Sequence, residues 1–163
     1  MAIIWRDQMS IDNGLIDNDH KCLIAIVNDL DVIHPGAGMP KQVTAILRRL
    51  NHYAQSHFMR EEQLQAAVGY TLADAHHHRH RALTHELDAM RVEWEIVRAP
   101  RDMIAFHRRL GEFLHHWLVD HILKDDLLMQ PFAAELRRHS VGMAPLGEGD
   151  TQHAAVAAPA ERS

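Results

Sequence analysis

Seven side chains in this sequence have the residue types and the spacing expected of metal ligands. Five are imidazoles and two are carboxylates: His20, His57, Glu61, His76, His80, His121 and Asp126. Imidazole nitrogen and carboxylate oxygen are common ligands of transition metals in proteins. We therefore interpret the seven as candidates for one metal centre, provided that the fold brings them to the same place.

Two pairs among these residues are spaced four positions apart. His57 and Glu61 form one pair, and His76 and His80 form the other. Residues at i and i+4 share one face of a helix, about one turn apart. Either pair alone is a weak signal, because surface helices often carry such pairs. Both pairs keep the phase of an apolar stripe, however, and a buried imidazole or carboxylate is costly without a partner. A metal would supply that partner.

Most of the remaining histidines do not keep this phase. The chain has 15 histidines, and His77 and His78 lie next to the second pair. Their positions predict that they point away from the ligand face and are solvated. His107 keeps the phase of its stripe but lies almost four helical turns from His121. We expect it to be a hydrogen-bonded core histidine.

Apolar stripes predict the helices that would position these ligands. Residues at alternating steps of three and four form such stripes within 20–30, 43–68, 73–97 and 103–121. This periodicity is typical of helices packed in a bundle. It predicts four helices of similar length, and no strand alternation or internal repeat competes with it. Short connections make successive helices antiparallel, so the predicted fold is an all-α, up-down-up-down four-helix bundle.

Helix-breaking residues mark several of the predicted boundaries. The segment HPGAGMP at 34–40 contains two glycines and two prolines and separates the first two helices. Asp17 or Asn18 could cap the first helix through its side chain. Pro131 would end the fourth helix or begin a short C-terminal helix that continues through Arg138.

The chain length favours one domain with a tail. At 163 residues it is long enough for one substantial core and too short for two comfortable ones. Residues 1–16 lack a helical stripe, so we expect an extended arm that lies on the bundle. The predicted domain covers residues 1–139. Residues 140–163 are dominated by Ala, Gly, Pro and Glu without periodicity, which predicts a disordered tail.

Composition argues against several classes of partner. The net charge is −5, from 17 Lys and Arg against 22 Asp and Glu, and no basic block is present. A nucleic-acid partner is therefore not expected. The apolar run at residues 1–5 is too short for a signal peptide or a membrane span, which predicts a cytoplasmic protein. Cys22 is the only cysteine, so no intrachain disulfide can form.

The spacing between His121 and Asp126 does not suit a regular helix. A residue five positions further on lies about 140° round an ideal α-helix, so Asp125 would be the simpler ligand on geometry alone. A π-type bulge, of the kind found at functional sites, would bring Asp126 inward. We therefore predict a local distortion of the helix between Leu118 and Leu128.

The order of the motifs resembles that of the hemerythrin family, specifically the bacterial hemerythrins. The pattern H…HxxxE…HxxxH…HxxxxD is complete, and the segments IDNDHKCL, HFMREEQL, GYTLADAHHHRH and WLVDHILKDD are similar as well. The resemblance covers residues from about 5 to 130. It favours Asp126 over Asp125, because the motif has four residues between its last histidine and its aspartate.

The resemblance implies two non-heme iron ions joined by an oxo or hydroxo bridge. The implied ligands are His76, His80 and His121 for one iron, His20 and His57 for the other, and Glu61 and Asp126 as bridges. Counting ligands leaves the second iron one short of six, and dioxygen would bind at that open position. The resemblance also implies an apolar oxygen pocket formed by Phe58, Trp117, Leu118 and Ile122.

The function implied by the resemblance is reversible dioxygen binding for storage, transport or delivery in a bacterial cell, and not enzymatic activity. Di-iron bundles of the ferritin-like class use Glu-x-x-His motifs. In this sequence the residues three positions after Glu61 and Glu62 are Leu64 and Gln65, so neither glutamate forms a Glu-x-x-His motif. The candidate ligands are mostly imidazoles, which favours an oxygen carrier. Two alternatives stay open. One is a sensory module that reports oxygen or redox state to an unidentified protein partner, and the other is a di-iron peroxidase or nitric-oxide-reducing enzyme.

Overall fold

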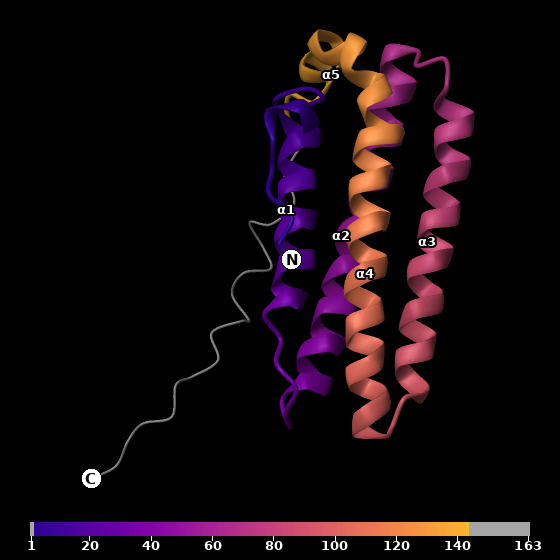
Figure 1. Cartoon of the computed structure of the whole chain (residues 1–163). Helices are drawn as coiled ribbons and strands as arrows, with labels where there is room; N and C mark the ends of the chain where they lie inside the picture. The colour runs from indigo at the N-terminus through magenta and orange to yellow at the C-terminus, as the bar shows by residue number, and fades with distance from the viewer. Residues whose placement is uncertain (1, 144–163) are drawn as a thin grey trace.

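A computed structural model describes residues 2–143 and confirms the predicted all-α bundle. Its long helices are α1 (Leu15–Asp31), α2 (Met39–Val68), α3 (Ala73–Ile96) and α4 (Pro100–Lys124). Successive helices run in opposite directions, and α1 and α3 each pack against both α2 and α4 (Figure 1). No strand occurs within residues 2–143. Most residues of the apolar stripes meet along the axis of the bundle, where they form the main core. A second, smaller cluster includes Leu64 of α2 together with residues before α1 and after α4, such as Ile11 and Leu136.

The helices differ in length more than the stripes predicted. The first has 17 residues, whereas the other three have 30, 24 and 25. The difference arises because the chain before Leu15 runs as an arm alongside α1. The prediction of four helices of similar length is therefore wrong for α1.

The side chains predicted to cap α1 lie inside that helix. Asp17 and Asn18 both follow its first residue, Leu15. The carboxylate of Asp12 instead accepts hydrogen bonds from three backbone N–H groups at the start of the helix, at 2.8 to 3.3 Å. The carboxylate of Asp17 accepts a hydrogen bond from the backbone N–H of Ile11 at 2.8 Å and so ties the arm to the helix. The capping prediction failed because α1 begins earlier than the stripe indicated.

The predicted first loop is confirmed, with a shorter extent. The last two residues of HPGAGMP, Met39 and Pro40, belong to the first turn of α2. Proline is tolerated there because its missing N–H would have no helical partner. The second connection begins at Gly69, whose φ of 67° lies in the left-handed region that favours glycine.

The described part of the N-terminal arm contains one short 3₁₀ turn, η1 (Asp7–Met9), and bends through residues 11–14 before α1. Leu15 and Ile16, which were predicted to belong to the arm, are the first two residues of α1. Ile3 and Asn28 of α1 exchange two hydrogen bonds, in which the backbone N–H of Ile3 donates at 2.7 Å and its carbonyl accepts at 2.9 Å. The ammonium group of Lys21 lies 4.9 Å from the centre of the Trp5 ring. These contacts hold the arm along α1, as predicted.

The C-terminal part of the described chain closes one end of the bundle. After α4 come a 3₁₀ helix, η2 (Asp126–Phe132), and a short helix, α5 (Ala133–His139). Arg137 donates a hydrogen bond to the backbone carbonyl of Asp12 at 2.8 Å, so α5 covers the arm. Of the predicted tail, residues 140–143 are described, and 144–163 lie outside the described residues.

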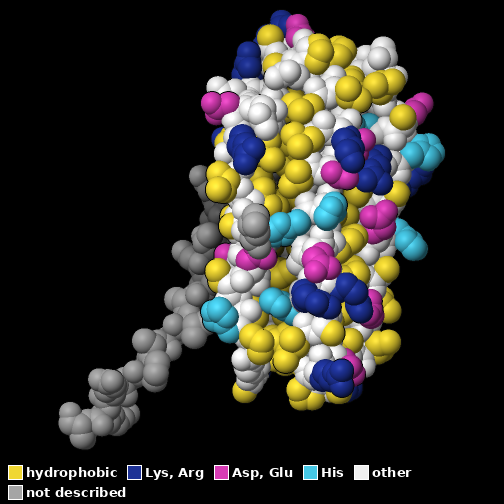
Figure 2. Space-filling view, in the orientation of Figure 1, with side chains coloured by type: hydrophobic (Ala, Val, Ile, Leu, Met, Phe, Trp, Pro, Cys, Tyr) yellow, Lys and Arg dark blue, Asp and Glu magenta, His cyan; other side chains and the backbone are white. Residues whose placement is uncertain are grey.

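The surface carries charges of both signs and several histidines. On the face shown in Figure 2, histidine side chains gather over α1 and α4, where His107, His115 and His116 line a groove. Within residues 2–143, no helix is both long enough and apolar enough to cross a membrane.

Candidate metal centre

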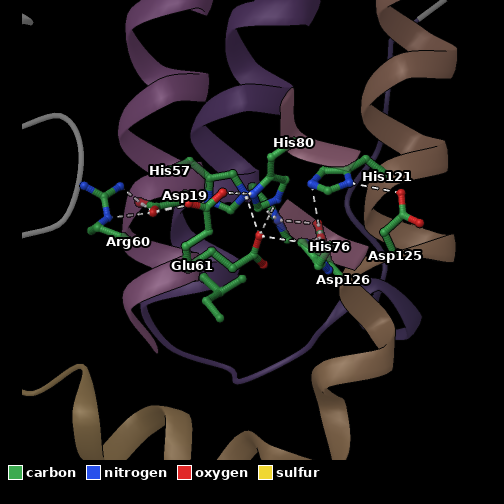
Figure 3. Close-up of polar contacts among 12 residues, drawn as sticks. Asp19, His57, Arg60, Glu61, His76, His80, His121, Asp125 and Asp126 are labelled. Carbon is green, nitrogen blue, oxygen red and sulfur yellow. Dashed lines mark hydrogen bonds and ion pairs between the residues drawn. The ribbon is translucent and has the colours of Figure 1, made fainter. Parts of the chain in front are cut away.

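The fold brings the seven candidate ligands together near the end of the bundle that is closed by α5. All four long helices contribute, and Asp126 comes from the first position of η2 (Figure 3). Each of the seven side chains is buried, and the most exposed, His76, has only 5% of its surface exposed. Burying so many histidines and carboxylates together is energetically costly unless they pair with one another or bind a cation.

Three histidines converge on the two carboxylates from one side. The Nε2 atoms of His76 and His121 both lie 3.1 Å from Oδ1 of Asp126. The Nε2 atom of His80 lies 3.1 Å from Oε2 of Glu61, and that of His76 lies 3.3 Å from the same oxygen. The five ligand atoms all lie within 4.8 Å of one another. We refer to this group as the three-histidine side.

Two further histidines approach the same carboxylates from the other side. The Nε2 atom of His20 lies 3.1 Å from Oδ2 of Asp126, and the Nε2 atom of His57 lies 3.9 Å from Oε2 of Glu61. The two Nε2 atoms are 3.2 Å apart. Together with Glu61 and Asp126 they form a second group of potential ligands, again within 4.8 Å. We refer to this group as the two-histidine side.

Several inward-facing atoms lack a hydrogen-bond partner, which fits a bound cation. Both side-chain oxygens of Asp126, Oε1 of Glu61 and the Nε2 atoms of His80 and His121 are buried without one. Some of them lie close together, yet they do not meet in hydrogen-bonding geometry. Buried polar atoms in native proteins nearly always have partners. These atoms converge on shared points, as ligands of metal ions do.

The electrostatics of the cluster also favour cations. Burial raises the pKa of Glu61, but the charge of His57 and a hydrogen bond from His76 hold it well below its usual range. Burial and the neighbouring Glu61 raise the pKa of Asp126, but the surrounding histidines, His121 first, hold it below its usual range. Burial lowers the pKa of His76, but the adjacent carboxylates of Asp126 and Glu61 raise it to about 10. Bound cations would take the place of protons on these imidazoles.

Asp126 reaches the cluster through a distortion of a different kind from the one predicted. The α-helix does not widen into a π-bulge. Instead α4 ends at Lys124, and Asp125, with φ −105° and ψ −56°, donates the last helical hydrogen bond, to the carbonyl of His121 at 2.9 Å. The chain then continues as the tighter 3₁₀ helix η2, with Asp126 fully buried at its first position. The predicted distortion is present, and the π-bulge is wrong.

Three carboxylates lie behind the cluster and contact the outer nitrogens of its histidines. The Nδ1 atom of His80 lies 2.8 Å from Oε1 of Glu62, and that of His121 lies 3.2 Å from Oδ2 of Asp125. On the opposite side, Nδ1 of His57 lies 3.6 Å from Oδ2 of Asp19. Such contacts orient an imidazole and raise its basicity toward a metal.

Two arginines hold two of these outer carboxylates, Asp19 and Asp125, in place. Arg60 donates hydrogen bonds to Oδ2 of Asp19, from its Nε atom at 3.0 Å and from a terminal nitrogen. Arg79 donates from Nε to Asp125 at 3.2 Å. Sequence reasoning did not assign these roles, although each carboxylate directly adjoins a candidate ligand in the chain. Asp125, the simpler ligand on helix geometry, faces outward and contacts His121 from behind.

The four residues of the expected oxygen pocket are buried among the ligands and the core. They have at most 4% exposure: Phe58, Trp117, Leu118 and Ile122. The ring of Phe58 stacks on His80, with centroids 4.0 Å apart, and meets His121 edge-on at 5.4 Å. Trp117 donates its indole N–H to the carbonyl of Leu83 at 3.1 Å. These residues form an apolar wall beside the imidazoles, and a role in binding oxygen stays a prediction.

The other histidines lie where the sequence predicted. His77 and His78 are exposed, and Nδ1 of His78 contacts the carbonyl of Asp74 at 2.7 Å. His107 is half-buried, with Nε2 3.0 Å from the carbonyl of Leu30. None of the three joins the cluster. One ligand, His76, also lines a small surface cavity of about 110 Å³ beside Tyr70.

The chain is similar to known proteins over most of its length. A family model described as the hemerythrin HHE cation binding domain matches residues 12–133. A bacteriohemerythrin of Stenotrophomonas maltophilia is 26% identical over 137 residues, which cover 84% of this chain and 83% of that protein. One from Pseudomonas aeruginosa is 27% identical over 76% of each chain. One from Clostridium acetobutylicum is 27% identical over 76% of this chain and 95% of its own.

Proposed function

Because the chain belongs to the hemerythrin family, we propose that it binds two non-heme iron ions and takes up dioxygen reversibly, for storage, transport or delivery in a bacterial cell. We further propose that the seven clustered residues are the ligands. Residues 1–139 would act as one domain, since the arm and α5 both pack on the bundle. The relatives named bacteriohemerythrin support this proposal.

One observation carries the proposal. The two groups of potential ligands share Glu61 and Asp126 and no other residue. Two cations bound by these groups would therefore be neighbours bridged by two carboxylates, and a single-metal site would not need this arrangement. Imidazole-rich coordination with shared carboxylates suits iron among the common transition metals.

The chemistry of such a centre depends on having two metals side by side. When bound, an iron pair supplies a dioxygen site and two electrons that can be returned when the gas leaves. The protein contributes three imidazoles on one side and two on the other, so the two-histidine side has one ligand fewer. We propose that dioxygen occupies this side.

The surrounding residues would protect the site from water. Phe58 packs against the imidazoles of His80 and His121, Trp117 packs against Phe58, and Leu118 and Ile122 are fully buried in the adjoining core. A dry apolar wall limits the entry of protons, which would promote irreversible oxidation. This arrangement favours a carrier over an enzyme that must admit and release polar substrates.

Metal content and visible spectroscopy test the proposal together. The purified, iron-loaded chain should contain two irons. After anaerobic reduction, admission of air should produce a visible absorption band that disappears on deoxygenation and returns over repeated cycles. His78→Ala serves as a matched control, because this exposed histidine lies beside the ligands on α3 without joining them.

Three results would contradict the proposal. One zinc ion per chain would remove the two-iron assignment. Two irons with a band that bleaches at once while peroxide or nitric oxide is consumed would instead identify an enzyme. A spectrum that does not respond to dioxygen would exclude a carrier.

A further inference from the structure

A second candidate binding site lies toward the opposite end of the bundle. It is a cavity of about 560 Å³ between the first half of α2 and the last turns of α3, near the start of α4. Trp94 lies in this cavity and follows His80 by 14 residues on the same helix, or about 21 Å at 1.5 Å per residue. The cavity is therefore separate from the metal centre, and none of its lining residues belongs to that centre.

The floor of the cavity is apolar. Leu47 and Trp94 are buried there, and Met103 of α4 is half-buried beside them. The indole N–H of Trp94 donates to the hydroxyl of Thr44 at 2.9 Å, which fixes the ring between α2 and α3. A volume of this size matches the pockets that hold small organic ligands in proteins. The floor would accept an aliphatic or aromatic group.

The rim of the cavity is positively charged. Arg48, Arg91 and Arg98 line it together with one carboxylate, Glu95. The excess of two positive charges contrasts with a net charge of −5 for the whole chain. Such a local reversal of sign favours anionic ligands.

The arginines differ in how far they are already neutralised. Arg91 pairs with Glu95 at 2.7 Å and with Asp88 at 3.5 Å. Arg98 donates only to the backbone carbonyl of Val97, at 2.9 Å. Within residues 2–143, Arg48 has no carboxylate partner. Arg48 and Arg98 therefore keep guanidinium donors available for an anion.

We propose that this cavity, which we call the arginine pocket, binds a small amphipathic anion, with an apolar body on Leu47 and Trp94 and a carboxylate or similar anionic group at Arg48 and Arg98. Asn51 provides a further polar contact. Its side-chain carbonyl accepts a hydrogen bond from Gln55 at 3.0 Å, which leaves its NH₂ group to donate. This proposal does not depend on the metal centre or on its chemistry.

A matched pair of fluorescent probes tests the charge and the apolar body separately. 8-Anilinonaphthalene-1-sulfonate carries both, and N-phenyl-1-naphthylamine has the same rings without the sulfonate. Titrated into the full, iron-loaded chain, the sulfonate should bind at one saturable site and about tenfold more tightly than the uncharged probe. Octanoate should displace it, whereas octan-1-ol at the same concentration should not. Because the ligand contacts both α2 and α3, octanoate should also raise the Tm.

Variants then locate the site. Arg48→Gln should weaken sulfonate binding several-fold and leave the uncharged probe unaffected, and Thr44→Trp should fill the cavity and reduce both. Arg81→Gln is the matched control, because Arg81 is an exposed arginine of α3 outside the pocket. Far-ultraviolet circular dichroism and urea unfolding must show that each variant is folded. Equal binding of the two probes, or sulfonate binding that Arg48→Gln leaves unchanged, would overturn the proposal.

Discussion

The two sides of the cluster differ in what lies behind their imidazoles. On the three-histidine side, carboxylates that are themselves 28% exposed contact the outer nitrogens of His80 and His121. On the two-histidine side, Nδ1 of His57 lies 3.6 Å from the buried Asp19, and the Nδ1 atoms of both His57 and His20 are buried without a hydrogen-bond partner. One side is connected to the surface through its outer contacts, and the other is sealed within the bundle.

From this difference we infer that the two sides have different roles, one in binding metal tightly and the other in binding the gas. On the three-histidine side, Arg79 extends the chain of contacts from His121 through Asp125 to solvent. Ligands fixed in this way are oriented before a metal arrives, which favours tight and permanent binding. The two-histidine side has fewer ligands and fewer outer contacts, and the carboxylate behind His57, Asp19, is buried. We expect this side to be where a small apolar gas binds.

The shared carboxylates give the largest expected effect, because they belong to both sides. Glu61→Ala would remove an oxygen from each group and leave five buried imidazoles around one carboxylate. We expect iron content to fall from two ions per chain to fewer than one, as measured by elemental analysis. Glu86→Ala on the exposed face of α3 is the control and should keep both irons. Two irons in Glu61→Ala would refute the bridging role.

Removing one histidine from each side should separate the two sites. His20→Ala should leave about one iron per chain, held by the three-histidine side, and should abolish the oxygen-dependent band. His121→Ala removes a ligand from the more constrained site and should leave less iron than His20→Ala. Elemental analysis and visible spectra of the two variants make the comparison direct. Equal loss of iron in both would mean that the sides do not differ as proposed.

The outer carboxylates should have smaller effects that also differ between the sides. Asp19→Ala leaves the partly buried Arg60 without its partner and should cost about 3 kcal/mol of unfolding free energy, within the range for breaking a buried pair. Asp125→Ala disrupts a more exposed pair with Arg79 and should cost about 1 kcal/mol or less. Urea unfolding of the metal-free proteins measures both. A larger loss of unfolding free energy in Asp125→Ala than in Asp19→Ala would contradict the proposed difference between the two sides.

The exposed histidines beside the ligands should have the smallest effect. His77→Ala and His78→Ala change side chains that lie outside both groups. Surface substitutions of this kind usually change stability by about 0.5 kcal/mol or less. Iron content and the visible spectrum should match those of the unmodified chain. Loss of one iron in either variant would extend the centre beyond the seven residues.

Helical phase alone predicted the bundle, and it placed six of the candidate residues on the inward-facing stripes of their own helices. His57, Glu61, His76 and His80 could be paired because i and i+4 positions always share a helix face. Asp126 was different, since helix geometry favoured Asp125 and only the resemblance to a family selected it. The change from α-helix to 3₁₀ helix that follows Lys124 cannot be found from periodicity.

Two of the three outer carboxylates that sequence reasoning missed act through contacts between helices, whereas the third, Asp125, contacts His121 four positions earlier in the chain. Asp19, on α1, meets His57 of α2, and Glu62, on α2, meets His80 of α3. No spacing within one helix indicates such contacts. The prediction of the residue that caps α1 was wrong for a related reason. The start of this helix is stabilised by Asp12, and the position of Asp12 depends on the conformation of the N-terminal arm.

At the junction between α4 and η2, the number of residues between His121 and Asp126 determines whether both side chains reach the cluster. His121 and Asp126 meet in the three-histidine group because the α-helix ends between them, at Lys124. Inserting or deleting one residue there would rotate the aspartate by roughly 100° and carry it out of the cluster. The connection at 32–38 positions no ligand and can vary in length. Insertions and deletions among homologues should therefore accumulate in that first loop and be absent between the last histidine and the last aspartate.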